Sequence, residues 1–196
     1  VLFDSNLEGV GSAFVGSDNP QFTTLMVDYL CRTGEAPTFF EIEAAPNPNA
    51  NRRRNAYLAT MEQLGHEPDV VSVEGQGWDF EGIGFERGRE MLGDRRLATN
   101  TVLCSNDRLA IGLIAAAYDC NIRVGHKADC QLRIAGQDDH PFSRFTCPPL
   151  TTIAQDYDAI SAKSLETLLE FIDGGMPDGG RQDTLFQGRL VMRASA

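Results

Sequence analysis

Short apolar runs alternate with amphipathic stretches along most of the chain. The run Thr101–Cys104 is rich in strand formers, and the Ser-Asn-Asp that follows it favours a helix start. Apolar side chains then recur at helical spacing to residue 118, and a second apolar run ends in Gly-Gln-Asp-Asp. The pattern predicts a strand–helix–strand unit whose parallel strands place Asn106 and Asp138 at one edge of a sheet. Gly112, in the middle of the helix, is expected to pack closely against that sheet.

The same alternation predicts further elements on both sides of this unit. Strands are expected at 13–16, 38–42, 70–73 and 150–154, and helices at 21–33, within 52–65, at 79–92 and at 156–172. Residues 184–186 and 189–192 are typical of a closing hairpin around Gln187-Gly188. The last helix is expected to turn its apolar residues inward, namely Ile160, Leu165, Leu168, Leu169 and Ile172. Strands that alternate with helices indicate the α/β class with mostly parallel sheet.

Length and charge narrow the class of protein. At 196 residues with 42% hydrophobic residues, the chain suits one large domain or two small ones. Its apolar runs are far shorter than the roughly 20 residues that span a membrane. The first two strands, VLFD at 1–4 and AFVG at 13–16, are not preceded by helices that would cover them, so we expect a sheet that misses strands and a sequence that starts after an N-terminal portion. The net charge of −11 disfavours direct binding to DNA.

Reactive chemistry is sparse. The five cysteines are odd in number and lack CxxC spacing, which is typical of reduced thiols, and the three histidines lack metal-ligand spacing. The sequence shows no Ser-His-Asp set and no phosphate-binding loop. Asp138 and Asp139 are adjacent, so their side chains are expected to diverge rather than share acid–base work. We therefore expect no enzyme, no metal and no cofactor.

Five stretches occur in the order and spacing of one known family. They are VGSDNPQFTTLMVDYLCRTG, RRRNAYLATMEQLG, SNDRLAIG with GQDD, PPLTTIAQDYDAISAKSLETLLEFIDG, and RLVMRAS. By these motifs nearly the whole chain resembles the effector core of the lactose/galactose-repressor (LacI/GalR) family of transcription regulators.

The resemblance implies a fold and a function. The fold would be two Rossmann-like subdomains with mostly parallel sheets and crossing strands, of the type I periplasmic-binding-protein-like kind, with the first subdomain incomplete. Residues 1–45 and 155–177 would form the N-terminal subdomain, and residues 46–154 and 178–196 the C-terminal one. The protein would be a cytoplasmic homodimer that binds a small effector, a sugar or polyol, between the subdomains. Effector binding would control DNA binding by a helix-turn-helix headpiece that is absent from this chain. No membrane contact is expected.

The resemblance also implies a set of ligand-binding residues. Arg53 matches the arginine on the first helix of the C-terminal subdomain, although Ala56 stands where the family has glycine. Asn106 and Asp138 match the family's cleft asparagine and aspartate. The crossing-strand motif gives Gln155 and Tyr157. Asp18 matches an aspartate in an early turn, and Trp78 an aromatic residue in the loop before a helix.

These residue types suit a sugar. Arg53 offers a fork of donors and Asp138 accepts from two hydroxyls, and each would offset the burial cost of the other. Asn106 and Gln155 both donate and accept, and an aromatic ring can cover a sugar face. The neutral amides of Asn47, Asn49 and Asn51 favour a neutral ligand over a phosphorylated one.

Each candidate has a plainer structural role. Asn106 and Asp18 would cap helices, Asp138 would close a turn, Arg53 would be one of three solvated arginines, Gln155 would satisfy backbone groups, and Trp78 and Tyr157 would pack. A second function also remains open, a periplasmic sugar-binding protein of a transport system, which would share the fold and the cleft. A secretion signal would favour that function, and a helix-turn-helix the regulator.

Overall fold

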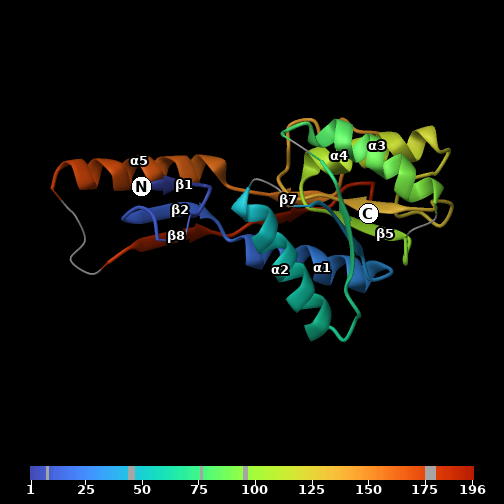
Figure 1. Ribbon diagram of the computed structural model, residues 1–196, viewed down its shortest axis with the longest axis horizontal. Helices are drawn as coiled ribbons and strands as arrows, with labels where there is room; N and C mark the ends of the chain where they lie inside the picture. Colours follow the sequence, from blue (N-terminus) through green and yellow to red (C-terminus); the bar gives the residue numbers. More distant parts are fainter. Residues whose placement is uncertain (8, 44–46, 76, 95–96, 175–179) are drawn as a thin grey trace.

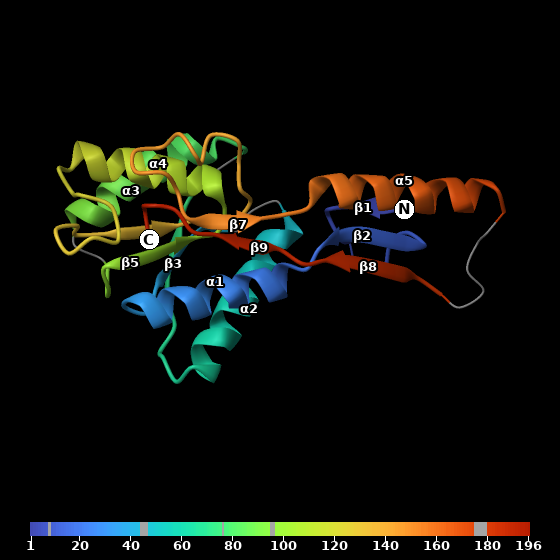
Figure 2. The ribbon, with the colours of Figure 1, turned by 180° about the vertical axis from the view of Figure 1, so that it is seen from behind.

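The computed structural model describes residues 1–7, 9–43, 47–75, 77–94, 97–174 and 180–196. Its elements form two units of unequal size joined side by side (Figures 1 and 2). In chain order they are β1 (Leu2–Phe3), β2 (Ala13–Ser17), α1 (Asn19–Thr33), β3 (Thr38–Ile42), α2 (Pro48–Gln63), β4 (Asp69–Val73), α3 (Phe80–Gly93), β5 (Thr101–Cys104), α4 (Asp107–Asp119), β6 (Arg133–Ala135), β7 (Thr152–Ala154), α5 (Tyr157–Ile172), β8 (Gln182–Phe186) and β9 (Arg189–Val191). The predicted α/β class with mostly parallel sheet is confirmed.

The larger unit is a three-layer sandwich. Its sheet has the order β4-β3-β5-β6, all parallel, with α1 and α2 on one face and α3 and α4 on the other (Figure 1). Successive side chains of a strand point to opposite faces. Phe39 therefore packs with Phe22 and Tyr57 in one core, while Phe40 packs with Leu113 in the other. Both phenylalanines are fully buried, so both faces of β3 are covered and the strand has no solvent-facing side.

The predicted strand–helix–strand unit is present as β5-α4-β6. Asn106 caps α4 through a hydrogen bond from the backbone N–H of Leu109 to Oδ1, at 2.8 Å. Gly112 is closely packed, as expected, but against α3 rather than the sheet. A Cβ there would lie 2.2 Å from the backbone oxygen of Glu81, so this crossing of α3 and α4 requires glycine.

The smaller unit is a parallel sheet in the order β1-β2-β8, and α5 lies along one face. The expected closing hairpin is wrong. β8 pairs with β2, whereas β9 pairs antiparallel with β7 in the larger unit. Gln187-Gly188 therefore carries the chain across from one unit to the other, beside the crossing from β7 to α5 (Figure 2). A Cβ on Gly188 would lie 2.6 Å from Ile153 Cγ2, so the two crossings pack tightly.

The division between the units differs from the expected residue ranges. Strand β3, assigned to the N-terminal subdomain, lies inside the larger sheet, and α1 packs on that sheet with α2. Strand β8, assigned to the C-terminal subdomain, belongs to the smaller sheet. The chain passes to the larger unit directly after β2, because the apolar face of α1 packs against the buried side of β3 and β5. The expected boundaries at 45 and 177 lie outside the described residues.

The expectation for the last helix is wrong at four of five positions. Ile160 is buried, but Leu165, Leu168, Leu169 and Ile172 are 44–70% exposed. The face of α5 that meets the sheet carries Ile160 and Thr167, both buried. The four exposed residues lie together on another face of the helix. Among the described residues, the helices are all too short or too polar to cross a membrane.

Candidate functional site

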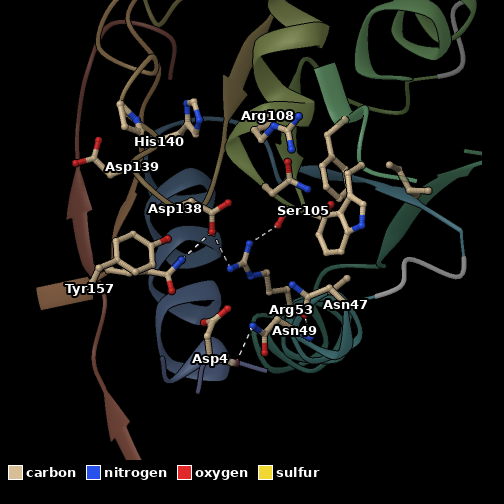
Figure 3. A pocket seen from close by; sticks show the side chains of 17 residues that line it. Asp4, Asn47, Asn49, Arg53, Ser105, Arg108, Asp138, Asp139, His140 and Tyr157 are labelled. Carbon is tan, nitrogen blue, oxygen red and sulfur yellow. Dashed lines mark hydrogen bonds and ion pairs between the residues drawn. The ribbon is translucent and has the colours of Figure 1, made fainter. Parts of the chain in front are cut away.

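A cavity of about 500 Å³ lies where the two units meet (Figure 3). Its lining comes from segments that directly follow β1, β3, β5, β6 and β7, and from the starts of α2, α3 and α5. Ligands of open α/β sheets bind outside the carboxyl ends of the strands. The size is in the usual range for small-molecule sites. Six of the seven expected residues line it, namely Arg53, Trp78, Asn106, Asp138, Gln155 and Tyr157.

Arg53 is the most constrained side chain of the site. It is 7% exposed, and its Nε donates to Asn19 Oδ1 at 2.8 Å. Its Nη1 donates to the backbone oxygens of Ser105 and Gln137 at 2.8 and 3.2 Å, and its Nη2 donates to Asp138 Oδ1 at 2.8 Å. A guanidinium has five N–H donors, so one N–H on Nη2 remains for a ligand. Arg53 is thus held by the protein rather than solvated.

Asp138 is paired but not saturated. Its Oδ1 accepts from Arg53 Nη2 and, at 2.7 Å, from Gln155 Nε2. No described residue donates to its Oδ2, which can still accept from a ligand at the cavity. The expected pairing of Arg53 and Asp138 is confirmed. Gln155 Oε1 in turn accepts from the Ser17 hydroxyl at the end of β2, so the polar network reaches the smaller unit.

Asn106 combines two roles. Its Oδ1 caps α4, as the plainer reading expected, and its amide nitrogen remains available at the cavity. Asp18 does not line the cavity. Its Oδ1 accepts from the backbone N–H of Gln21 at 3.0 Å and caps α1.

Two aromatic side chains lie at the cavity, as expected. Trp78 is 61% exposed and meets Phe80 edge to face, with ring centroids 5.8 Å apart. Tyr157 lies at the start of α5. Burial, and then the negative charge of Asp138, raise the pKa of the Tyr157 phenol, which therefore stays a neutral hydroxyl that can donate.

The sequence reasoning missed several lining residues. Asp4, Ser105, Arg108, Asp139 and His140 all contribute to the cavity. Asp4 follows a strand end, the same signal that identified Asn106 and Asp138, but β1 has only two residues. Asn47 and Asn49 of the expected amide loop line the cavity, whereas Asn51 does not.

A buried carboxyl behind the cavity was also missed. Asp107 is fully buried, and its Oδ2 accepts from the His140 backbone N–H at 2.8 Å and from Ser143 Oγ at 2.5 Å. Its Oδ1 accepts from Thr152 Oγ1 at 2.5 Å. Burial, then the charge of Asp138, raise the pKa of Asp107 from 3.8 to about 6. Asp107 thus joins the start of α4 to the loop after β6 and to the crossing strand β7.

The arrangement is suited to binding. In the described part of the chain, no group of three or more His, Cys, Asp or Glu side chains could hold a metal ion. The cavity offers a held guanidinium, a free carboxylate oxygen, amides and aromatic rings. Such groups can hydrogen-bond to hydroxyl groups and cover an apolar face of a ligand.

Comparison with known proteins gives the family. Residues 29–196 match the model of the periplasmic binding protein-like domain. The chain is 36% identical over 200 residues to the HTH-type transcriptional regulator reg1 of Streptomyces lividans, a match that covers all of this chain and 55% of that protein. It is 32% identical over 144 residues to the ribose operon repressor of Escherichia coli, covering 73% of this chain and 39% of that protein. The chain thus spans about half the length, or less, of these relatives.

Solved structures agree on the fold. A LacI-family transcriptional regulatory protein from Corynebacterium glutamicum superposes with a TM-score of 0.81 at 22% identity, covering all of this chain and 72% of that chain. A LacI family transcriptional regulator from Enterococcus faecium, solved with bound ribose, has a TM-score of 0.79 at 20% identity, covering 97% and 67%. The expected periplasmic-binding-protein-like architecture is confirmed.

Proposed function

We propose that this chain, which belongs to the family of periplasmic binding protein-like domains, is the effector-binding core of a LacI-type transcriptional regulator. The relatives named above are a transcriptional regulator and a repressor, which favours this function over a transport protein. We infer that the effector is a sugar or polyol bound in the cavity between the two units. The proposed role is that of a ligand sensor in the cytoplasm and not of an enzyme.

One observation carries the proposal. The Arg53–Asp138 pair is held in place by the protein's own groups, and it keeps one N–H and one carboxylate oxygen unused at the cavity. Two vicinal hydroxyls can use both groups, one as acceptor and one as donor. Preorganised groups lose little freedom on binding, which favours affinity. Asn106, Gln155, Tyr157 and Trp78 then supply further hydroxyl contacts and an aromatic surface.

The proposed mechanism uses both units. Asp4 comes from the smaller unit, Arg53 and Asp138 come from the larger one, and Gln155 follows the crossing strand β7. A ligand that contacts all of them favours one relative position of the units over others. It can shift the equilibrium only by its difference in affinity for the two positions. We propose that this shift passes, in a homodimer, to a helix-turn-helix outside these 196 residues, because the acidic chain itself suits DNA poorly.

A thermal-shift screen tests the proposal. The melting temperature of the purified protein is measured with pentoses, hexoses, disaccharides and polyols. The same measurements are then repeated on the Arg53→Ala and Asp138→Ala variants. We expect one ligand class to raise the melting temperature of the unsubstituted protein and to lose this effect in both variants. Asp156→Asn is the matched control, since Asp156 caps α5 and Asn is an equally good cap. Unchanged ligand shifts in both alanine variants contradict the site.

A further inference from the structure

The charged side chains at the cavity are paired, with one exception. Three ion pairs neutralise most of them: Arg53 with Asp138 at 2.8 Å, Arg108 with Glu81 at 2.6 Å, and Asp139 with Arg193 at 2.6 Å. Arg108 keeps its Nη1 hydrogens for a ligand, but its charge is compensated because both oxygens of Glu81 accept from it. The Nδ1 of His140 accepts from the backbone N–H of Phe142 at 3.3 Å.

Asp4 is the exception. Among the described residues, no Lys, Arg or His nitrogen lies within salt-bridge distance of its carboxylate. Its place at the cavity is fixed, because Asn49 Nδ2 donates to its backbone oxygen at 3.1 Å and its own N–H donates to Val15 O at 3.0 Å. Its φ of 58° is a left-handed conformation that Asp and Asn tolerate better than most residues. The described lining therefore carries one carboxylate without an ion pair. Burial raises the pKa of Asp4, while the nearby positive charge of Arg53 acts to lower it.

The position of Asp4 gives this charge a role. Asp4 and Asp138 lie on opposite sides of Arg53 at the cavity (Figure 3). Both carboxylates accept hydrogen bonds and neither donates. The single remaining N–H of Arg53 lies next to Asp138 and cannot neutralise an additional anion, because the charge of Arg53 is already balanced. A hydroxyl or an ammonium group can bind beside either carboxylate, whereas a phosphate or carboxylate meets repulsion there.

We propose that Asp4 makes the site selective for neutral or positively charged sugars and excludes sugars that carry a phosphate or a carboxylate. The inference rests on the proposed function, since it concerns the same cavity. Like charges inside a partly desolvated site repel more strongly than in water. We expect an anionic sugar to bind at least about tenfold more weakly than its neutral counterpart.

Matched ligand pairs test the inference. Dissociation constants are measured by titration calorimetry at pH 7.5 for ribose and ribose 5-phosphate, and for glucose, glucosamine, glucose 6-phosphate and glucuronate. The protein is compared with Asp4→Asn, which keeps the left-handed backbone and the side-chain shape and removes the charge. Asp156→Asn is again the control, because it removes a carboxylate outside this cavity. Repeating the series at high salt shows how much of the discrimination is screened.

The outcomes separate the inference from the proposed function. The inference predicts that the neutral or amino sugar binds best, and that Asp4→Asn narrows its advantage over the anion at least about fivefold while Asp156→Asn does not. An anionic sugar that binds more tightly than its neutral partner overturns the inference and leaves the sugar site standing. An unchanged ratio in Asp4→Asn overturns the assignment to Asp4. If neither these sugars nor any member of the wider sugar panel binds, the proposed function is overturned, and the inference with it.

Discussion

Replacing the buried Asp107 by asparagine is expected to change the pH dependence of stability. The pKa of Asp107 is raised from 3.8 to about 6, so the folded protein holds this proton more tightly than the unfolded chain. For such a group the stabilising contribution is full below about pH 4 and is lost as pH rises through about 6. The two pKa values give a loss on the order of 1 kcal/mol between pH 5 and pH 8. Asp107→Asn does not titrate and lacks this loss.

The substitution also changes hydrogen bonding. Thr152 Oγ1 accepts from the backbone N–H groups of Asp138 and Asp139 at 3.2 Å each, so it donates to Asp107, and the asparagine oxygen can keep that bond. The asparagine NH₂ then faces the backbone N–H of His140, donor against donor. This costs about 1–3 kcal/mol at every pH. The variant is therefore expected to be clearly less stable at pH 5 and closer to the parent protein at pH 8.

Urea unfolding followed by circular dichroism at pH 5, 6, 7 and 8 measures both effects. Taking the difference between parent and variant removes the contributions of carboxyls that do not interact with Asp107. Asp119→Asn, at the far end of α4 in an exposed pair with Arg89, is the control and is expected to cost less than about 1 kcal/mol. A difference between parent and Asp107→Asn that stays constant from pH 5 to pH 8 refutes the raised pKa.

Two further predictions concern packing and the aromatic surface. Gly112→Ala is expected to cost about 1–3 kcal/mol of unfolding free energy, because its Cβ would lie 2.2 Å from Glu81 O. The control Gly93→Ala has open space around the added Cβ and should not destabilise the protein. Equal urea midpoints for the two variants contradict the α3–α4 contact. Trp78→Ala is expected to leave stability within about 0.5 kcal/mol, because the side chain is 61% exposed, and to weaken ligand binding by about 1 kcal/mol, or about fivefold in Kd. Calorimetric titration with unchanged affinity would remove Trp78 from the site.

Local patterns predicted most of the elements and part of the site. The period of apolar residues located α4 and its flanking strands, and the rule that strand ends meet at one edge placed Asn106 and Asp138 together. The pairing of Arg53 with Asp138 followed from the resemblance, and the structure adds that Asn19 and two backbone oxygens hold the guanidinium. Those three partners are distant from Arg53 in the sequence, so no local pattern predicts these contacts.

The main misses share a physical cause: they depend on contacts between segments, which the spacing of residues along the sequence does not show. β8 and β9 are separated by two residues and read as a hairpin, yet each finds a better partner in a different unit. The inward face of α5 was inferred from the helical spacing of its apolar residues, but spacing alone does not show which face of a helix meets the sheet. Asp4 was missed because the expected strand VLFD included it, whereas β1 ends at Phe3 and Asp4 follows the strand end.

The central claim is that Arg53 and Asp138 together bind the hydroxyls of a sugar effector. Titration calorimetry of the best ligand from the sugar screen, on the parent protein, Asp138→Asn and the control Asp156→Asn, tests it most directly. Losing a charge-assisted hydrogen bond costs about 1.5–3 kcal/mol, so Kd should rise about 10- to 150-fold in Asp138→Asn and stay unchanged in the control. An Asp138→Asn protein that stays folded and binds as tightly as the parent contradicts the claim.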